Sequence, residues 1–168
     1  MVGHSQVSTH LTARGEVQMV NVAEKPVTRR RAEAESRVQM SAAAFELLAS
    51  NTAPKGDVLG TARLAGIMAA KKTSDLIPLC HPLPLTHVAV ELSLEPSQHL
   101  VQVRATVETQ GKTGVEMEAL VAASAAALTI YDMLKASDRG MSIGPTRLVH
   151  KSGGASGDFT NATPVRDP

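Results

Sequence analysis

The segment from Ala119 to Met133, ALVAASAAALTIYDM, constrains the fold most, because it is apolar around nearly the whole circumference of the helix that it predicts. A helix on the outside of a small domain normally shows one polar face. This helix, expected from Gly114 to about Ser137, therefore needs a second buried face. In a chain of 168 residues, which suits a single domain, that face has to meet another copy of the protein. We expect a homo-oligomer.

The composition excludes several classes of partner. A net charge of +1 and an aromatic content of 2% argue against nucleic-acid binding, which needs a basic surface and stacking platforms. No segment reaches the roughly 20 consecutive apolar residues of a membrane span, and the N-terminus has no signal-peptide pattern, so we expect no membrane association. The single cysteine, Cys80, cannot form an internal disulfide, which fits a reducing, cytoplasmic location.

The order of the predicted elements is typical of one α+β sandwich. Apolar periodicity and capping residues predict, in chain order, a strand at Glu16–Val22, a short strand at Ser36–Met40, helices at 42–50 and 57–72, a hairpin of strands at 86–94 and 100–107, the long helix, and a strand at Ser142–His150. This order matches the β-α-β-β-α-β plan of ferredoxin-like folds, an antiparallel sheet with helices on one face. We expect residues 1–15 to be a flexible tail, 16–151 a single catalytic domain, and 152–168 a mobile Gly/Ser-rich tail.

The proline-rich segment Leu76–Leu85 carries the first candidate site residues. Its three prolines favour a stiff, extended backbone that can aim a side chain at a ligand. His81 is then either a structural histidine or a group that transfers protons near neutral pH. Zinc is a third interpretation, but Cys80 and His81 are adjacent and have no partners at metal-ligand spacing, so no metal site is predicted. Cys80 alone is more typical of a small buried side chain than of a nucleophile.

The start of the long helix carries a pair of carboxylates. The preceding Gly111–Thr113 is not a phosphate loop, because that motif needs a glycine where this chain has Thr106. Thr113 and Glu116 fit a capping box, which is a structural role. Glu118 has no such role, and together with Glu116 it can handle protons or bind a guanine edge.

The other end of this helix carries Asp132 and Lys135, which fit a surface ion pair at i,i+3 spacing. Asp132 follows a wholly apolar run, however, so we expect it to be drawn inward. Lys55 lies just before a helix start, where it is either a solvated lysine or a group that shares an anionic ligand with the helix. A straight helix separates Glu116 from Asp132 by about 24 Å. Antiparallel packing of two such helices would bring them together in one site shared by two subunits.

Two more cations are candidate anion ligands. Arg30 lies in a basic cluster, and Lys151 precedes Gly153 and Gly154, whose backbone can wrap phosphate oxygens. The alternatives are a solvated run of charges for Arg30 and a flexible tail for Lys151.

Five collinear segments together resemble the cyclic pyranopterin monophosphate synthase family, also called molybdenum cofactor biosynthesis protein C. They are KGDVL (55–59), ARLAGIMAAKKTSDLIPLCHPLPL (62–85), GKTGVEMEAL (111–120), LTIYDMLKA (128–136) and KSGGASGD (151–158). The resemblance runs from about Val17 to Asp158. It implies a ferredoxin-like hexamer, a trimer of dimers, with active sites at subunit interfaces. It also implies conversion of (8S)-3′,8-cyclo-7,8-dihydroguanosine 5′-triphosphate to cyclic pyranopterin monophosphate and diphosphate. We expect no tightly bound cofactor, and the sequence leaves open whether magnesium accompanies the substrate phosphates.

The resemblance also implies the site residues. Catalytic roles fall on Asp132, Lys55, Lys135, His81 and Glu116. Substrate contacts fall on Leu79, Cys80, His81, Met117, Glu118, Arg30 and Lys151.

The chain departs from the family pattern at three positions: Asn21 replaces a common aspartate, Leu134 a frequent cysteine, and Ala155 a basic residue. A second hypothesis is a non-catalytic module that binds a nucleotide at its subunit interface. Such a module would have no need for a buried carboxylate beside two lysines, so Lys55, Asp132 and Lys135, with Asp132 expected to be buried, favour the enzyme.

Overall fold

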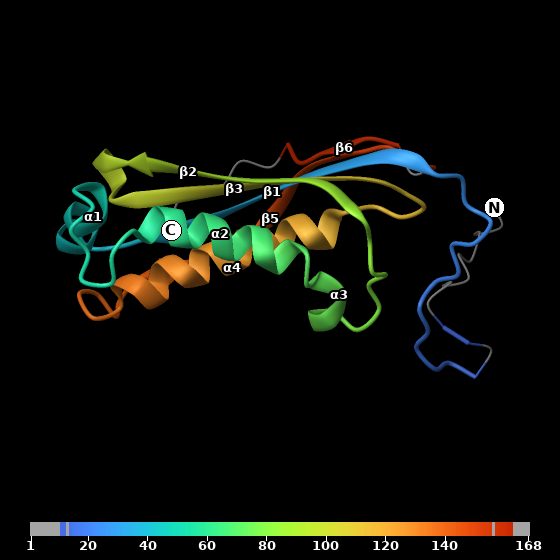
Figure 1. Cartoon of the computed structure of the whole chain (residues 1–168), viewed down its shortest axis with the longest axis horizontal. Helices are drawn as coiled ribbons and strands as arrows, with labels where there is room; N and C mark the ends of the chain where they lie inside the picture. Colours follow the sequence, from blue (N-terminus) through green and yellow to red (C-terminus); the bar gives the residue numbers. More distant parts are fainter. Residues whose placement is uncertain (1–10, 13, 156, 163–168) are drawn as a thin grey trace, which may run out of the picture.

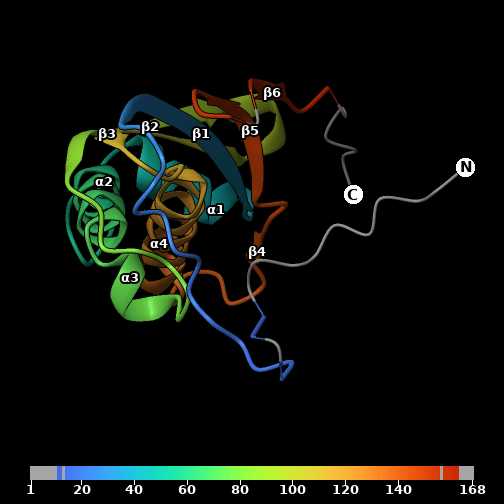
Figure 2. The same cartoon turned by 90° about the vertical axis from the view of Figure 1, so that its right-hand side faces the viewer.

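The computed structural model describes residues 11–12, 14–155 and 157–162, which form two layers. An antiparallel sheet lies over two long helices (Figure 1), and the end-on view shows the sheet arched over both of them (Figure 2). The strands are β1 (Thr28–Gln39), β2 (Leu85–Glu95), β3 (Leu100–Gly111), β4 (Ser142–Ile143), β5 (Arg147–Ser152) and β6 (Phe159–Thr160). The helices are α1 (Ala42–Ala49), α2 (Val58–Ala70), α3 (Thr73–Leu76) and α4 (Glu116–Leu134).

The sheet order confirms the predicted ferredoxin-like fold. The order is β2-β3-β1-β5-β6, with β4 pairing beside β5 on the same side of β1. The central β1 pairs with β3 along its whole length, from Thr28 opposite Gly111 to Gln39 opposite Leu100. The helices α2 and α4 pack against each other and cover one face of the sheet. Both ends of α4 therefore lie near loops that leave the sheet.

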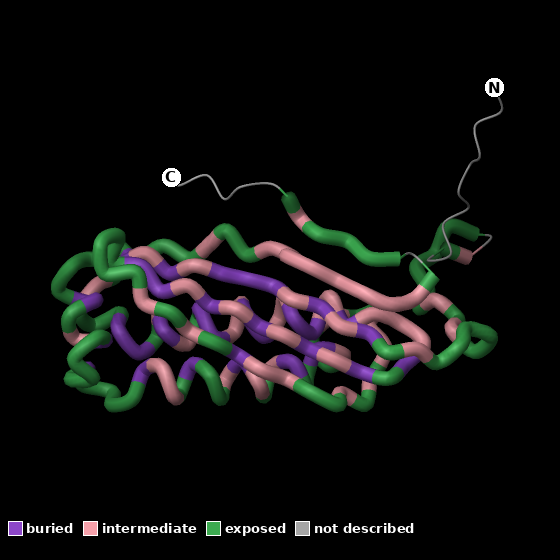
Figure 3. The backbone as a smooth tube through the Cα atoms, turned by 90° about the horizontal axis from the view of Figure 1, so that it is seen from above, coloured by how far each residue is buried: buried purple, intermediate pink, exposed green. Residues whose placement is uncertain are grey.

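The core between the layers is built from small side chains. Five alanines of α4 are completely buried: Ala119, Ala122, Ala123, Ala126 and Ala127. They pack in one apolar cluster with buried alanines and valines of the central strands. The buried positions run along the middle of the structure, while its ends are exposed (Figure 3). Because alanine ends at Cβ and loses no rotamer freedom, this packing lets backbones approach closely at little entropic cost.

The predicted starts of the first two helices and the predicted hairpin are confirmed. Ser41 caps α1, since its Oγ accepts the N–H of Ala44, and Asp57 caps α2, since its Oδ1 accepts the N–H of Gly60. The strands β2 and β3 are joined by a short 3₁₀ turn at Pro96–Gln98.

Two predictions in the N-terminal part are wrong. The region Glu16–Val22 forms no strand beyond one isolated bridge. The strand expected at Ser36–Met40 instead begins at Thr28, so the basic cluster lies within β1. Because side chains alternate along a strand, Arg30 is 8% exposed while its neighbour Arg29 is exposed.

The expected strand at Ser142–His150 is divided into β4 and β5. Pro145 lies between them, and a proline has no N–H to donate to a sheet. β5 continues to Ser152 and pairs with β6, so the region expected as a C-terminal tail contains a strand. Residues 163–168 of that region, and residues 1–10 and 13 of the expected N-terminal tail, lie outside the described residues.

The helix α4 is long and apolar enough to cross a membrane by length and composition alone. However, half of its most apolar stretch is buried inside the domain, against the sheet and α2. Its apolar character is thus accounted for, on one side, by the core of the fold.

Gly66 provides a test of the close packing between α2 and α4. A Cβ at this position would lie 2.9 Å from the carbonyl oxygen of Ala122 and 3.0 Å from Cγ2 of Val90. We expect Gly66→Ala to lower the free energy of unfolding by about 1–2 kcal/mol, because overpacking outweighs the helix propensity gained from alanine. Urea denaturation measures this. A variant as stable as the wild type would show that α2 moves away from α4 without cost.

Candidate functional site

Two adjoining cavities lie around the N-terminal end of α4. The first, of about 370 Å³, is lined by Val20, Val22, Lys25, Leu79, Cys80, His81, Leu83, Thr113, Gly114, Glu116, Met117 and Glu118. The second, of about 520 Å³, is lined by Lys25, Pro26, Thr28, Arg30, Lys112, Thr113, Gly114, Glu116, Lys151, Gly154 and Ala155. Lys25, Thr113, Gly114 and Glu116 line both, so the cavities form two halves of one elongated site.

The first cavity combines apolar walls with a few polar groups. Leu79, Cys80 and His81 come from the extended segment between α3 and β2, and Met117 from the first turn of α4. The Nε2 atom of His81 lies 2.9 Å from the carbonyl oxygen of Val20. Because a carbonyl can only accept, Nε2 carries the proton and donates it, which fixes the tautomer of a neutral His81.

Burial raises the pKa values of two acidic side chains in the first cavity, Glu118 and Cys80. Glu118 is 4% exposed, and this burial, together with the nearby charge of Glu116, raises the pKa of its carboxyl group; a hydrogen bond to its own backbone opposes the shift. Burial, and secondarily Glu118, also raises the pKa of the Cys80 thiol. A protonated thiol is a poor nucleophile, which agrees with the sequence-based interpretation of Cys80 as a small buried side chain.

The second cavity is rich in cations. Lys25, Arg30, Lys112 and Lys151 line it together with one carboxylate, Glu116. The Nζ of Lys151 lies 3.4 Å from Oε1 of Glu116. This excess of positive charge favours an anionic ligand.

The predicted capping box at the start of α4 is wrong. The N-cap residue is Val115, and no side chain caps the helix there. The carboxylate of Glu116 instead turns toward Lys151 and the second cavity. Glu116 therefore does not cap the helix, and its carboxylate is available in the cavities.

A third group of charges lies at the opposite end of α4. The Nζ of Lys55 donates to both the backbone oxygen and Oδ2 of Asp132, each at 2.8 Å, and the Nζ of Lys135 lies 2.7 Å from Oδ1. Hydrogen bonds from Lys135 and then Lys55, with their charges, lower the pKa of Asp132 to about 2. Asp132 likewise raises the pKa of Lys135. Asp132 is an ionised carboxylate held between two ammonium groups.

The prediction that Asp132 is drawn inward is wrong. The side chains of Lys55, Asp132 and Lys135 are 45%, 56% and 52% exposed, respectively. The reason is the position of Asp132 on α4, where the buried residues Ile130, Met133 and Leu134 occupy the inner side of the last turns. The charged group therefore sits on the surface and lines neither cavity.

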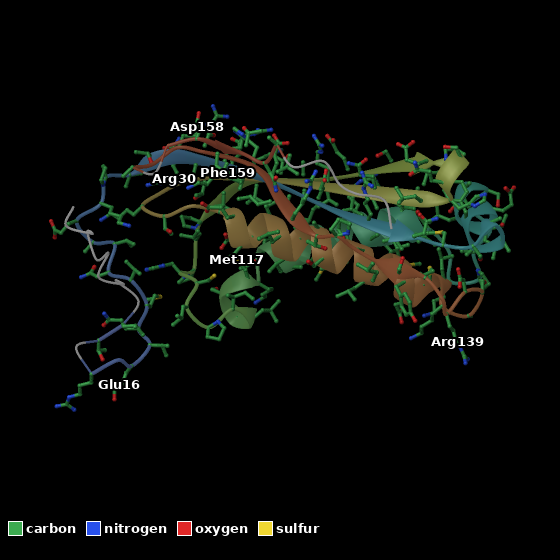
Figure 4. The ribbon with its side chains drawn as sticks, turned by 180° about the vertical axis from the view of Figure 1, so that it is seen from behind. Glu16, Arg30, Met117, Arg139, Asp158 and Phe159 are labelled. Atoms are coloured by element: carbon green, nitrogen blue, oxygen red, sulfur yellow. The ribbon has the colours of Figure 1, made fainter. Side chains whose placement is uncertain are left out.

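Within one chain, the predicted site residues form two separate groups. Met117, at the start of α4, and Arg139, just beyond its end, mark the opposite ends of the helix, with Arg30 on the Met117 side (Figure 4). The group near Met117 consists of Arg30, Leu79, Cys80, His81, Glu116, Met117, Glu118 and Lys151, all of which line a cavity. The group at the other end consists of Lys55, Asp132 and Lys135. At 1.5 Å per residue, Glu116 and Asp132 are about 24 Å apart along α4.

Sequence reasoning missed one wall of the site, the segment from Val20 to Lys25. It has no regular structure, and it is held by hydrogen bonds from His81 to Val20 and from Lys112 to Ala23. The β-like apolar spacing of this segment arises because Val20 and Val22 line a cavity. Lys25 has no sequence signal beyond its charge and the proline that follows it, which indicates an extended backbone. Lys112 lies in the segment GKTGVEMEAL but is not among the predicted site residues.

Among the described residues, no group of three or more His, Cys, Asp or Glu side chains is arranged to hold a metal ion.

The fold and these charged groups define an α+β protein whose cation-lined cavity suits a small anionic ligand. Comparison with known proteins identifies it further: the sequence pattern of the MoaC family matches residues 19–154. Proteins named cyclic pyranopterin monophosphate synthase are 61% identical in Roseiflexus sp. (91% of this chain, 97% of the relative) and 58% identical in Herpetosiphon aurantiacus (90% and 92%). A relative of the same name in Cereibacter sphaeroides is 59% identical (90% and 95%). The chain belongs to the MoaC family.

The buried carboxyl group of Glu118 predicts a pH-dependent stability. The pKa of Glu118 is higher in the folded state than in the unfolded state, where it is about 4.3. The stabilisation is fully present below about pH 4.3, and the free energy of unfolding of the wild type falls as the pH rises through the folded-state pKa. Glutamine cannot ionise, so the free energy of unfolding of Glu118→Gln should rise relative to that of the wild type as the pH is raised from about 4 to about 8. Urea unfolding at both pH values measures the difference. A difference that does not change with pH would mean that water reaches the carboxylate.

Proposed function

We propose that the chain is a cyclic pyranopterin monophosphate synthase of molybdenum cofactor biosynthesis. The reaction converts (8S)-3′,8-cyclo-7,8-dihydroguanosine 5′-triphosphate to cyclic pyranopterin monophosphate and releases diphosphate. The observation that carries this proposal is the pairing of an apolar cavity that contains a buried carboxyl group with a cationic cavity, in a chain about 60% identical to synthases of this name. A substrate with a planar heterocycle at one end and a triphosphate at the other matches these two halves.

The first cavity takes the guanine-derived ring system. Leu79, Leu83 and Met117 supply apolar surface for the flat faces of the rings. Glu118, buried beside them, is suited to accept the N–H groups of the guanine edge when ionised and to hold a proton when neutral. His81, with its proton fixed on Nε2, keeps Nδ1 available as an acceptor.

The second cavity takes the phosphates. Its cations offset the charge of the triphosphate and the charge that develops on the departing diphosphate. Glu116, which lines both cavities, stands where the sugar-derived part of the substrate would join ring and phosphates. That position suits a group that moves protons while the five-membered ring opens and the pyran ring closes.

Lys55, Asp132 and Lys135 complete the site from a second copy of the chain. Their distance from the cavities excludes them from the same substrate within one chain, and their exposure leaves them accessible to a partner. In this group Asp132 orients the two ammonium groups, which can donate protons to the substrate and stabilise negative charge on the phosphates.

An exposed apolar surface on the helices supports assembly through this layer. Leu64 and Met68 of α2 and Leu128 of α4 are 58%, 58% and 59% exposed. Apolar side chains so exposed on two adjacent helices are typical of an interface. The oligomer we propose is a hexamer, a trimer of dimers, in which antiparallel α4 helices join the two ends of the site. The enzyme works in the cytoplasm, and magnesium, where present, accompanies the substrate phosphates.

Supplying the cyclised nucleotide to purified protein, and measuring pterin product and diphosphate, tests the activity. Asp132→Asn and Lys55→Ala should each lower turnover by at least about a hundredfold, because each removes one member of the proton-transfer group. Asp75→Asn is a matched control, since Asp75 also forms an exposed i,i+3 ion pair, with Lys72 at 3.3 Å. Normal turnover by both site variants would contradict the assignment, whereas loss in the control would point to a general effect of surface charge.

Mixing two inactive variants tests whether each site is shared. Asp132→Asn damages one end of α4 and His81→Ala the other, so a dimer that contains one copy of each variant retains one site with both ends intact. After random subunit exchange, half of the dimers contain one copy of each variant, and each of these dimers has one intact site out of two. About a quarter of the wild-type activity should therefore return. No recovery, with exchange verified by mass spectrometry, would mean that each chain builds its site alone.

A further inference from the structure

Arg30 lies where three strands separate at one end of the sheet. Its strand, β1, pairs with β3 up to Gly111 and with β5 up to Ser152, and both neighbours then leave the sheet as loops. Residues 112–114 of the first loop and residues 154–155 of the second both line the second cavity. Backbone carbonyl groups at such a point have lost their ladder partners and need other donors.

The guanidinium group of Arg30 supplies those donors. Its Nε donates to the carbonyl of Gly111 at 3.4 Å, its Nη2 to Lys112 at 3.3 Å, and its Nη1 to Gly153 at 3.3 Å. The residue is only 8% exposed, and its contacts among the described residues are with carbonyl oxygens and not with a carboxylate. A buried cation that is bonded to both loops fixes the distance between them.

Gly154 fits closely against this group. Its φ is +84°, and a Cβ there would lie 1.5 Å from Nη1 of Arg30. The loop can therefore close over the guanidinium only with glycine at this position.

We propose that Arg30 is a positioning residue: it holds the two loops at the spacing that fits the phosphates of the substrate, and the lysines of the cavity make the principal phosphate contacts. This inference rests on the proposed function only in taking the second cavity as the phosphate side. The planar guanidinium group donates from three separate nitrogen atoms, one for each carbonyl. A lysine has a single donor nitrogen, which cannot occupy those three positions. A positive charge at position 30 is therefore not sufficient to hold the two loops at this spacing.

The test compares Arg30→Lys, which keeps the charge, with Gly154→Ala, which displaces the guanidinium from the loop side. Gly157→Ala is the matched control, because Gly157 also has a positive φ, of +66°, but a Cβ there would meet nothing within 4 Å. We expect the first two variants to bind inorganic diphosphate about tenfold or more weakly by calorimetry, the loss that follows from one hydrogen bond to a charged group. The control should bind within about twofold of the wild type.

Combining the variants separates positioning from direct binding. Arg30→Lys and Gly154→Ala act on one contact, so the double variant should lose less than the product of the two single effects. The same losses should appear in KM for the cyclised nucleotide, while the melting temperatures show that the variants stay folded. Wild-type affinity for diphosphate in Arg30→Lys, multiplicative effects in the double variant, or no diphosphate binding by the wild type would each overturn the proposal. Diphosphate binding that follows the expected order, without pterin product from the wild type, would support the positioning role and contradict the proposed function.

Discussion

The close approach of α4 to the sheet is the constraint on which the rest of the structure depends. Five completely buried alanines on this helix leave little side-chain bulk between its backbone and the strands. The helix α2 adds the same kind of contact through Gly66. With α4 fixed in this way, its first turn can place Met117 and Glu118 in a cavity whose other walls come from loops at the same end of the sheet.

A rigid helix also determines how the site can be divided. Because α4 is straight and packed along its length, its two ends cannot bend toward one substrate, and the acid–base group around Asp132 stays far from the cavities. The electrostatic character of the two ends differs as well. Burial raises the pKa of Glu118, whereas Lys135 and Lys55 lower the pKa of the exposed Asp132 to about 2. One helix thus presents a group that favours the neutral state and a group that favours the charged state.

The sequence predicts the layer plan, because that plan depends on local signals. The roles of the site residues stay a prediction, and the structure shows which of those residues line the two cavities. The caps at Ser41 and Asp57, the alternation in β2 and β3, and the apolar run in α4 are each readable from a few neighbouring residues. The failures depend on tertiary contacts. Asp132 was expected inside because it follows an apolar run, but the rotation of α4 against the sheet decides which side is buried.

Contacts between distant residues account for the other failures. The segment before β1 has strand-like spacing but forms no strand; Val20 and Val22 line a cavity, while Val17 and Met19 are exposed. The three carbonyl partners of Arg30 come from residues far apart in the sequence, and no local pattern indicates them.

The irregular segment from Val20 to Lys25 gives the first cavity an unusual mechanical property. Its side of the cavity is held through His81 and Lys112 rather than through sheet hydrogen bonds or the alanine core. Regions with few buried contacts open at a free energy far below that of global unfolding. Moving this segment away from the cavity breaks the side-chain hydrogen bonds of His81 and Lys112 but no strand pairing, so it requires no melting of the sandwich.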